Sequence, residues 1–179
     1  MNRRAVGIQM LYHHPTYTSF MKPVLERSDI QLADTFDHGV AQIVLDYPLT
    51  WAITQLEKMD SIARARTLVA TQTSQPIYQD CLASFHLSGV VNSTNENALL
   101  SAIYAAASAQ KTYQWQSRLT YMELRVTRLL LQGLDTKRLA KQLQISYKTV
   151  NAHISNILGK LDLESRAQYL AALLNPLTS

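Results

Sequence analysis

Apolar and polar positions alternate with helical periodicity in the last third of the chain, from residue 119 onward. Apolar side chains recur at helical spacing up to Gly133, which suits the left-handed residue that ends a helix. Asp135 and Ser146 stand where a side-chain oxygen caps the start of the next two helices. A fourth apolar stripe runs from Leu163 to Leu174. We therefore predict a domain of four helices with tight, capped turns.

The predicted helix after Ser146 has two distinct faces. Its apolar stripe, expected to pack on the two preceding helices, is Val150, Ile154, Ile157 and Leu161. The opposite face carries Lys148, Asn151, Ala152, Ser155 and Asn156. Short hydrogen-bonding side chains on a face without carboxylates fit the major groove of DNA, where they reach base edges. We predict base contacts from Asn151, Ala152 and Ser155.

Charge is distributed unevenly between the two parts of the chain. Before residue 119 nine basic residues meet nine acidic ones, whereas from residue 119 onward eight basic residues meet four acidic ones. Localised positive charge attracts a polyanion such as DNA. Contacts to its phosphates are expected from Lys137, Tyr147, Lys148, Thr149, Asn156 and Lys160.

The first part of the chain alternates short apolar runs with helical patterns. The expected strands are residues 5–11, 30–36, 42–47, 67–71 and 88–91. The expected helices are residues 19–27, 49–65, 76–86 and 96–109. Such alternation favours an α/β fold with a five-stranded parallel sheet covered on both faces. The short interval between residues 36 and 42 leaves one covering helix reduced or missing.

The length of 179 residues, 47% of them hydrophobic, is enough for one mid-sized and one small core. We divide the chain into a sheet domain at residues 1–109, a polar linker at 110–118 and a helical domain at 119–179. No stretch is long and apolar enough for a membrane span, and residues 1–14 lack the pattern of a signal peptide. A cytoplasmic protein is expected.

Nothing in the sequence predicts an enzyme, a metal site or a cofactor. Cys81 is the single cysteine, which excludes an internal disulfide and a cysteine-cluster zinc site and favours a buried, inert thiol. The five histidines are scattered, and the chain has no glycine-rich phosphate loop and no nucleophile elbow.

Residues 119–166 resemble the LuxR-type helix-turn-helix of the NarL/FixJ response regulators. The residue types shared with that family are Leu119, Thr120, Glu123, Gly133, Leu134, Lys137, Ala140, Leu143, Ile145, Ser146, Thr149, Val150, His153, Asn156, Ile157, Lys160, Leu161 and Arg166. Met122, Arg125 and Asn151 depart from it, and Asn151 stands where a lysine is frequent at the start of the base-reading face. We expect this chain to read a different DNA site from its relatives.

The sheet domain resembles, more weakly, a response-regulator receiver, a flavodoxin-like fold. By this resemblance Asp46 is the phosphate acceptor and Thr71 its hydroxyl partner, while Tyr12 and His13 occupy the positions of the acidic pair that holds Mg²⁺. Asn92 stands where the family has a lysine. We therefore interpret Asp46 and Thr71 as a vestigial phosphorylation site in a degenerate receiver.

The predicted function is sequence-specific DNA binding by an atypical response regulator that regulates transcription as a homodimer. The expected partners are double-stranded DNA with an inverted repeat, a second copy of the chain, and a protein or small molecule on the receiver-like domain. Three alternatives remain open: phosphorylation-dependent switching at Asp46, an acyl-homoserine-lactone receptor, and an interaction protein that sequesters another regulator without binding DNA.

Overall fold

We describe a computed structural model that covers residues 6–26, 29–34, 40–113 and 117–174. By their internal contacts, these residues form two compact units. The first unit comprises residues 1–72 and 85–114, and the second comprises residues 73–84 and 115–179. The helix at Pro76–Ala83 thus groups with the second unit, a feature that the sequence division at residues 109 and 118 does not include. That division stays a prediction.

The first unit is built on a parallel sheet, as predicted. Its five strands, in chain order, are β1 (Val6–Leu11), β2 (Ile30–Leu32), β3 (Ala41–Asp46), β4 (Thr67–Thr71) and β5 (Gly89–Asn92). Their order across the sheet is β2-β1-β3-β4-β5, with every pair parallel. Asp46 pairs with Thr71, and Thr71 with Asn92. The register therefore brings these three residues together at the carboxyl ends of neighbouring strands.

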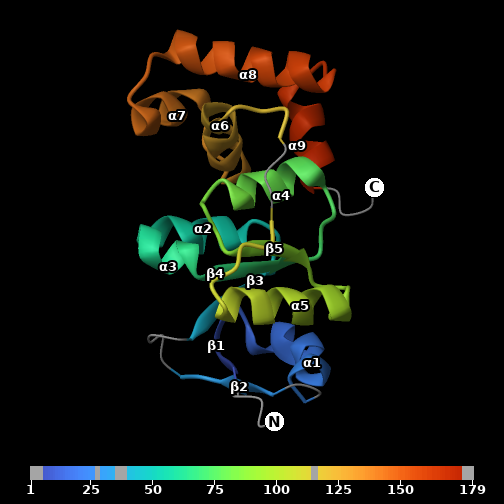
Figure 1. The fold of residues 1–179 in the computed structure, drawn as a ribbon. Coiled ribbons are helices and arrows are strands. Elements are labelled where there is room, and N and C mark those ends of the chain that lie inside the picture. The colour runs from blue at the N-terminus through green and yellow to red at the C-terminus, as the bar shows by residue number, and fades with distance from the viewer. Residues whose placement is uncertain (1–5, 27–28, 35–39, 114–116, 175–179) are drawn as a thin grey trace. The chain divides into compact units, whose positions relative to one another are not determined.

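Helices cover both faces of the sheet, which explains why β3 and β4 are buried along their whole length. Figure 1 shows α1 (Lys22–Glu26) and α5 (Glu96–Ala107) on one side of the strands and α2 (Trp51–Lys58) and α3 (Ser61–Ala65) on the other. The core beneath α1 and α5 includes Ile8, Met21, Ile43, Leu45, Leu68, Leu99 and Ile103. The α/β, receiver-like prediction is confirmed.

Three boundaries in this unit were predicted wrongly. The expected helix 49–65 is interrupted: Met59 is extended, and Asp60 Oδ1 accepts the Ala63 N–H at 2.8 Å to start α3. The expected helix 19–27 begins instead as a 3-10 helix, η1 (Pro15–Met21), which α1 continues. Strand β2 ends at Leu32, and residues 35 and 36 of the expected strand lie outside the described residues. Most of the interval between residues 36 and 42, where a covering helix was expected to be reduced or missing, lies outside the described residues, so that expectation stays a prediction.

The second unit contains the four predicted helices of the C-terminal domain. They are α6 (Tyr121–Leu131), α7 (Thr136–Leu143), α8 (Tyr147–Leu161) and α9 (Arg166–Leu174). Gly133 adopts a φ of 79° after α6, as expected for a helix-terminating glycine. Their shared core includes Leu124, Leu139, Val150, Ile157, Tyr169 and Leu173.

Helix α4 (Pro76–Ala83) packs on α6 within this second unit. Arg128 of α6, only 7% exposed, donates to Ser84 Oγ at 3.2 Å. Cys81 is buried beside them, and burial raises the pKa of its thiol, as expected for an inert cysteine. Among the residues described, no helix is long and apolar enough to cross a membrane.

Candidate nucleic-acid interface

Helix α8 begins at the predicted serine cap. Ser146 Oγ accepts the backbone N–H of Thr149 at 3.0 Å and lies 2.8 Å from the Thr149 hydroxyl. Just before it, Gln144 has a φ of 56°, the left-handed conformation that ends α7. Helix α7 is capped in the same manner, because Asp135 Oδ1 accepts the Arg138 N–H at 2.9 Å. Local side-chain chemistry therefore fixes the turn that presents α8.

Burial divides α8 into the two faces that the sequence predicts. Val150 and Ile157 are fully buried, and Ile154 and Leu161 are partly buried. Asn151, Ala152 and Ser155 are exposed, as are Lys148, Asn156 and Gly159 around them. The orientation predicted for this helix is thus confirmed: its short polar side chains face outward and its aliphatic side chains face the core.

The residues expected to contact phosphates are also at the surface. Lys137, Tyr147, Lys148, Thr149, Asn156 and Lys160 are all exposed, and the Tyr147 side chain lies at the first position of α8. Arg138 and Lys141 of α7 are exposed as well, although the sequence analysis did not single them out. The signal for them was the surplus of basic residues after residue 119. Arg138 lies 3.7 Å from Asp135, a solvent-exposed pair of little energetic weight.

A buried carboxylate of α6 holds the far end of α8. Thr120 and Glu123 form a capping box: Glu123 Oε2 accepts the Thr120 N–H at 2.7 Å, and Thr120 Oγ1 accepts the Glu123 N–H at 3.3 Å. Lys160 Nζ donates to the same Glu123 Oε2 at 2.7 Å. Burial acts to raise the pKa of Glu123, but the hydrogen bonds from Lys160 and Thr120 outweigh it and hold that pKa below its ordinary value.

This role of Lys160 was not predicted from the sequence, where Lys160 was expected to contact DNA phosphates alone. The threonine and glutamate three residues apart are a signal for the capping box. No local pattern marks Lys160 as the third member, because it lies 37 residues further along the chain.

Two further hydrogen bonds attach α9 to α6 and to the turn between α6 and α7. Thr127 Oγ1 donates to the Glu123 carbonyl at 2.8 Å, so the Tyr169 hydroxyl, 2.7 Å away, is the donor to Thr127. Burial raises the pKa of the Tyr169 phenol, which keeps it protonated as this donor. Arg166 Nη2 donates to the Leu134 carbonyl at 2.8 Å, which joins the start of α9 to the turn between α6 and α7.

In the first unit, Asp46 is buried and its carboxylate accepts hydrogen bonds from two neighbouring elements. Its side chain is 2% exposed; Oδ1 accepts the Ala52 N–H at 3.0 Å, and Oδ2 accepts the Thr71 hydroxyl at 3.1 Å. The carboxylate therefore holds the first turn of α2 and the end of β4. The predicted pair of Asp46 and Thr71 is thus in contact, in a position shielded from solvent.

The positions that the receiver resemblance places around Asp46 carry Tyr12, His13 and Asn92. Tyr12 and His13 follow the end of β1, and the His13 ring meets the Trp51 ring edge-on at 6.1 Å between centroids. Asn92 Oδ1 accepts the N–H and the hydroxyl of Thr94, at 2.9 and 2.7 Å. Within the described residues, no group of three or more His, Cys, Asp or Glu side chains could hold a metal ion.

Comparison with known proteins places the second unit in a family. The family model described as "Bacterial regulatory proteins, luxR family" (GerE) matches residues 117–172. The spore germination protein GerE of Bacillus subtilis is 43% identical over 65 residues, which are 36% of this chain and 88% of GerE. The nitrate/nitrite response regulator NarL of Escherichia coli is 29% identical over 92 residues, and the matched region is 50% of this chain and 43% of NarL.

Solved structures resemble the chain along nearly its whole length. RcsB of Salmonella enterica serovar Typhimurium, bound to the promoter P1flhDC in the presence of the phosphomimetic BeF₃⁻, gives a TM-score of 0.65 at 18% identity. The match covers 94% of this chain and 98% of RcsB. A structure of two RcsB dimers bound to two parallel DNAs gives a TM-score of 0.61 at 19% identity, and the match covers 97% of this chain and 99% of that one. These likenesses concern the fold.

The parallel sheet and the capped helix-turn-helix together define the fold of a response regulator with a LuxR-type helix-turn-helix domain. The matches to the family model and to nearly the whole of GerE identify its family. The chain belongs to the luxR family of bacterial regulatory proteins.

Proposed function

We propose that the protein regulates transcription by placing α8 in the major groove of a specific double-stranded DNA site. The observation that carries this proposal is the exposure of Asn151, Ala152 and Ser155 on one face of α8. Short side chains let a helix approach the base edges closely, and the amide and hydroxyl groups can bond to them. This face has no carboxylate to repel the phosphates.

Phosphate contacts would fix the register of the helix on the duplex. We assign them to Lys137, Tyr147, Lys148, Thr149, Asn156 and Lys160, all exposed. Lys160 would make its contact from the ion pair with Glu123, so its weight in DNA binding is expected to be smaller than that of Lys148. RcsB, which shares the fold of this chain, is solved on promoter DNA, and this is consistent with DNA as the partner.

We propose that the protein binds DNA as a homodimer on an inverted-repeat site. Helix α9 has an exposed apolar side formed by Ala167, Ala171 and Leu174, a surface that a second copy would cover. A two-fold dimer places two recognition helices about 34 Å apart, one turn of DNA. The structure of RcsB dimers on DNA is consistent with this arrangement.

We further propose that this regulator does not switch by conventional phosphorylation of Asp46. A phosphate donor would have to reach a carboxylate that is 2% exposed and accepts the Ala52 N–H and the Thr71 hydroxyl. Tyr12 and His13 offer no carboxylate for Mg²⁺, and Asn92 offers no cation for the phosphoryl group. No enzymatic activity is proposed.

Selection of binding sites from random duplexes, followed by fluorescence anisotropy on the selected site, tests DNA binding. We expect enrichment of an inverted repeat and an affinity that falls steeply with salt. A protein that sequesters another regulator would enrich no sequence, even at low ionic strength. Intact-mass spectrometry after incubation with acetyl phosphate and Mg²⁺ tests the proposal on Asp46: no adduct is expected, and an adduct at Asp46 that tightens DNA binding would contradict it.

A further inference from the structure

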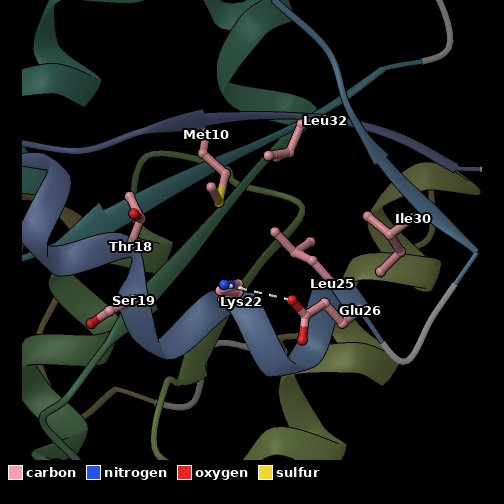
Figure 2. A pocket seen from close by; sticks show the side chains of 8 residues that line it. All are labelled: Met10, Thr18, Ser19, Lys22, Leu25, Glu26, Ile30 and Leu32. Atoms are coloured by element: carbon pink, nitrogen blue, oxygen red, sulfur yellow. Dashed lines mark ion pairs between the residues drawn. The ribbon is translucent and has the colours of Figure 1, made fainter.

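An open pocket lies at the β2 edge of the first unit, between that edge and the helical segment η1 and α1. It has a volume of about 460 Å³, within the range of small-molecule sites. Figure 2 shows its lining, to which β1 contributes Met10, β2 contributes Ile30 and Leu32, and the helical segment contributes the other residues. The reduced segments here, a five-residue α1 and a three-residue β2, leave this hollow uncovered.

The floor of the pocket is apolar. Met10 and Leu25 are partly buried against the core to which Ile30 belongs. In Figure 2 the Leu25 side chain projects from α1 toward Met10 and Leu32. Leu32 is 57% exposed, a large fraction for an aliphatic side chain on a strand. A ligand with an apolar body would remove this surface from water.

The rim of the pocket is polar and carries both signs of charge. Lys22 Nζ lies 3.8 Å from Glu26 Oε1, and both side chains are largely exposed, so the two groups hold each other weakly. Thr18 Oγ1 donates to the Pro15 carbonyl at 2.7 Å, and Ser19 Oγ donates to the Thr16 carbonyl at 3.0 Å. The two hydroxyls therefore have only lone pairs left for a ligand. Among the described residues, the rim offers one cation, Lys22, and three acceptor groups, those of Glu26, Thr18 and Ser19.

We propose that this pocket binds a small zwitterion with an apolar body, the chemistry of an apolar α-amino acid. The carboxylate of the ligand would pair with Lys22, its ammonium group with Glu26 and the hydroxyl oxygens, and its side chain would cover Met10, Leu25 and Leu32. Such a ligand satisfies every group of the rim, whereas a simple anion would leave Glu26 unpaired beside its own charge. The idea that this ligand is a signal for the regulator rests on the proposed function. The binding of the ligand to the pocket does not.

Isothermal titration of the full-length protein with L-leucine, L-phenylalanine and L-tryptophan tests this inference. Two further ligands each lack one charge: 3-phenylpropionate has no ammonium group, and phenethylamine has no carboxylate. We expect saturable binding of at least one amino acid, and binding at least tenfold weaker for both one-charge ligands. Equal binding of 3-phenylpropionate and phenylalanine would overturn the zwitterion assignment, and no binding of any amino acid at millimolar concentration would overturn the site.

Three variants locate the binding. Lys22→Met and Glu26→Gln should each weaken it about tenfold or more, and Leu32→Asp should abolish it by placing a carboxylate in the floor. Leu32 is exposed enough for this change to leave the fold intact, which circular dichroism checks. Lys58→Met, an exposed lysine of α2 that does not line the pocket, is the matched control. Binding that survives Leu32→Asp and Lys22→Met would contradict the inference.

These titrations contain no DNA, so they are independent of the proposed function. Failure of the amino acids to bind leaves the DNA-binding proposal untouched. Failure of the site selection leaves the pocket chemistry untouched.

Discussion

Lys160 Nζ and Glu123 Oε2 lie 2.7 Å apart and join the C-terminal half of α8 to the start of α6. The Glu123 side chain is 4% exposed and also accepts the Thr120 N–H, so one carboxylate caps α6 and anchors α8. Because the lysine side chain is 37% exposed, its ammonium group keeps contact with solvent. The pair keeps a cation at the edge of the exposed face of α8 while it holds that helix in place.

Removal of the lysine should therefore reduce stability as well as DNA binding. We expect Lys160→Met to lower the free energy of unfolding by about 1 to 3 kcal/mol, because it leaves a buried carboxylate short of a charged donor. Urea denaturation measures this change. Lys141→Met, at an exposed lysine of α7, should change stability by less than about 0.5 kcal/mol. Equal stability of the two variants would show that the ion pair adds nothing.

The same carboxylate predicts a pH dependence of stability. The pKa of Glu123 in the folded state is held below its ordinary value of 4.5, so its contribution is fully present above pH 4.5 and is lost as the pH falls through the folded pKa. Urea titrations of wild type and Glu123→Gln from pH 7 to pH 3 test this. We expect wild type to be more stable at pH 7 and the difference to shrink below pH 4.5. A difference independent of pH would contradict the assignment.

These long-range bonds mark the limit of what the sequence could predict. Caps such as Ser146, Asp135 and Gly133 were predictable because each acts within a few residues. The inward face of α8 was predictable because helical periodicity assigns it. The partner of Lys160 was not, since nothing in a local pattern selects one carboxylate of the chain for a given lysine. The break at Met59 was missed because residues 49–65 keep a helical pattern through it, although Asp60 carried the cap signal.

In the first unit, sequence spacing placed Asp46, Thr71 and Asn92 at strand ends, and the register confirms that they are neighbours. What the spacing could not show was the burial of Asp46 and its bond to the Ala52 N–H. The pocket at the β2 edge was equally hidden, because it depends on how short η1, α1 and β2 are in the fold.

Asp46 should behave as a structural residue. Asp46→Ala removes the oxygens that accept the buried N–H of Ala52 and the hydroxyl of Thr71, so we expect a loss of about 1 to 3 kcal/mol in the free energy of unfolding. Asp46→Asn keeps a carbonyl oxygen for one of them and should lose less. Thermal and urea unfolding measure both variants. An Asp46→Ala variant as stable as wild type would favour a functional role for the carboxylate.

The buried pair of Thr127 and Tyr169 should contribute to the attachment of α9. Tyr169→Phe removes the donor to Thr127 Oγ1, and we expect a loss of about 0.5 to 1.5 kcal/mol. A double-mutant cycle with Thr127→Val isolates this bond, although that change also removes the bond to the Glu123 carbonyl. Additive effects of the two changes would mean that the hydroxyls do not interact energetically.

The exposed face of α8 predicts two kinds of effect on DNA binding. Ser155→Ala and Asn151→Ala should each cost about 1 to 3 kcal/mol at particular base pairs, because base contacts carry sequence information. Lys148→Met should weaken binding to all duplexes alike and reduce the slope of affinity against salt. Anisotropy titrations on the selected site and its single-base variants, at several salt concentrations, distinguish these effects.

Asn151 also bears on which site is read. Asn151 is exposed on the face of α8 that we propose enters the groove. Asn151→Lys adds a cation to that face, so it should tighten DNA binding and change the preferred bases near residue 151. Site selection with both proteins measures the change. Lys148, a cation already present on the same face of α8, shows what effect a lysine there has in the wild-type protein. The same consensus for wild type and Asn151→Lys would mean that Asn151 lies outside the groove, and α8 would then have to enter it with a different part of its exposed face.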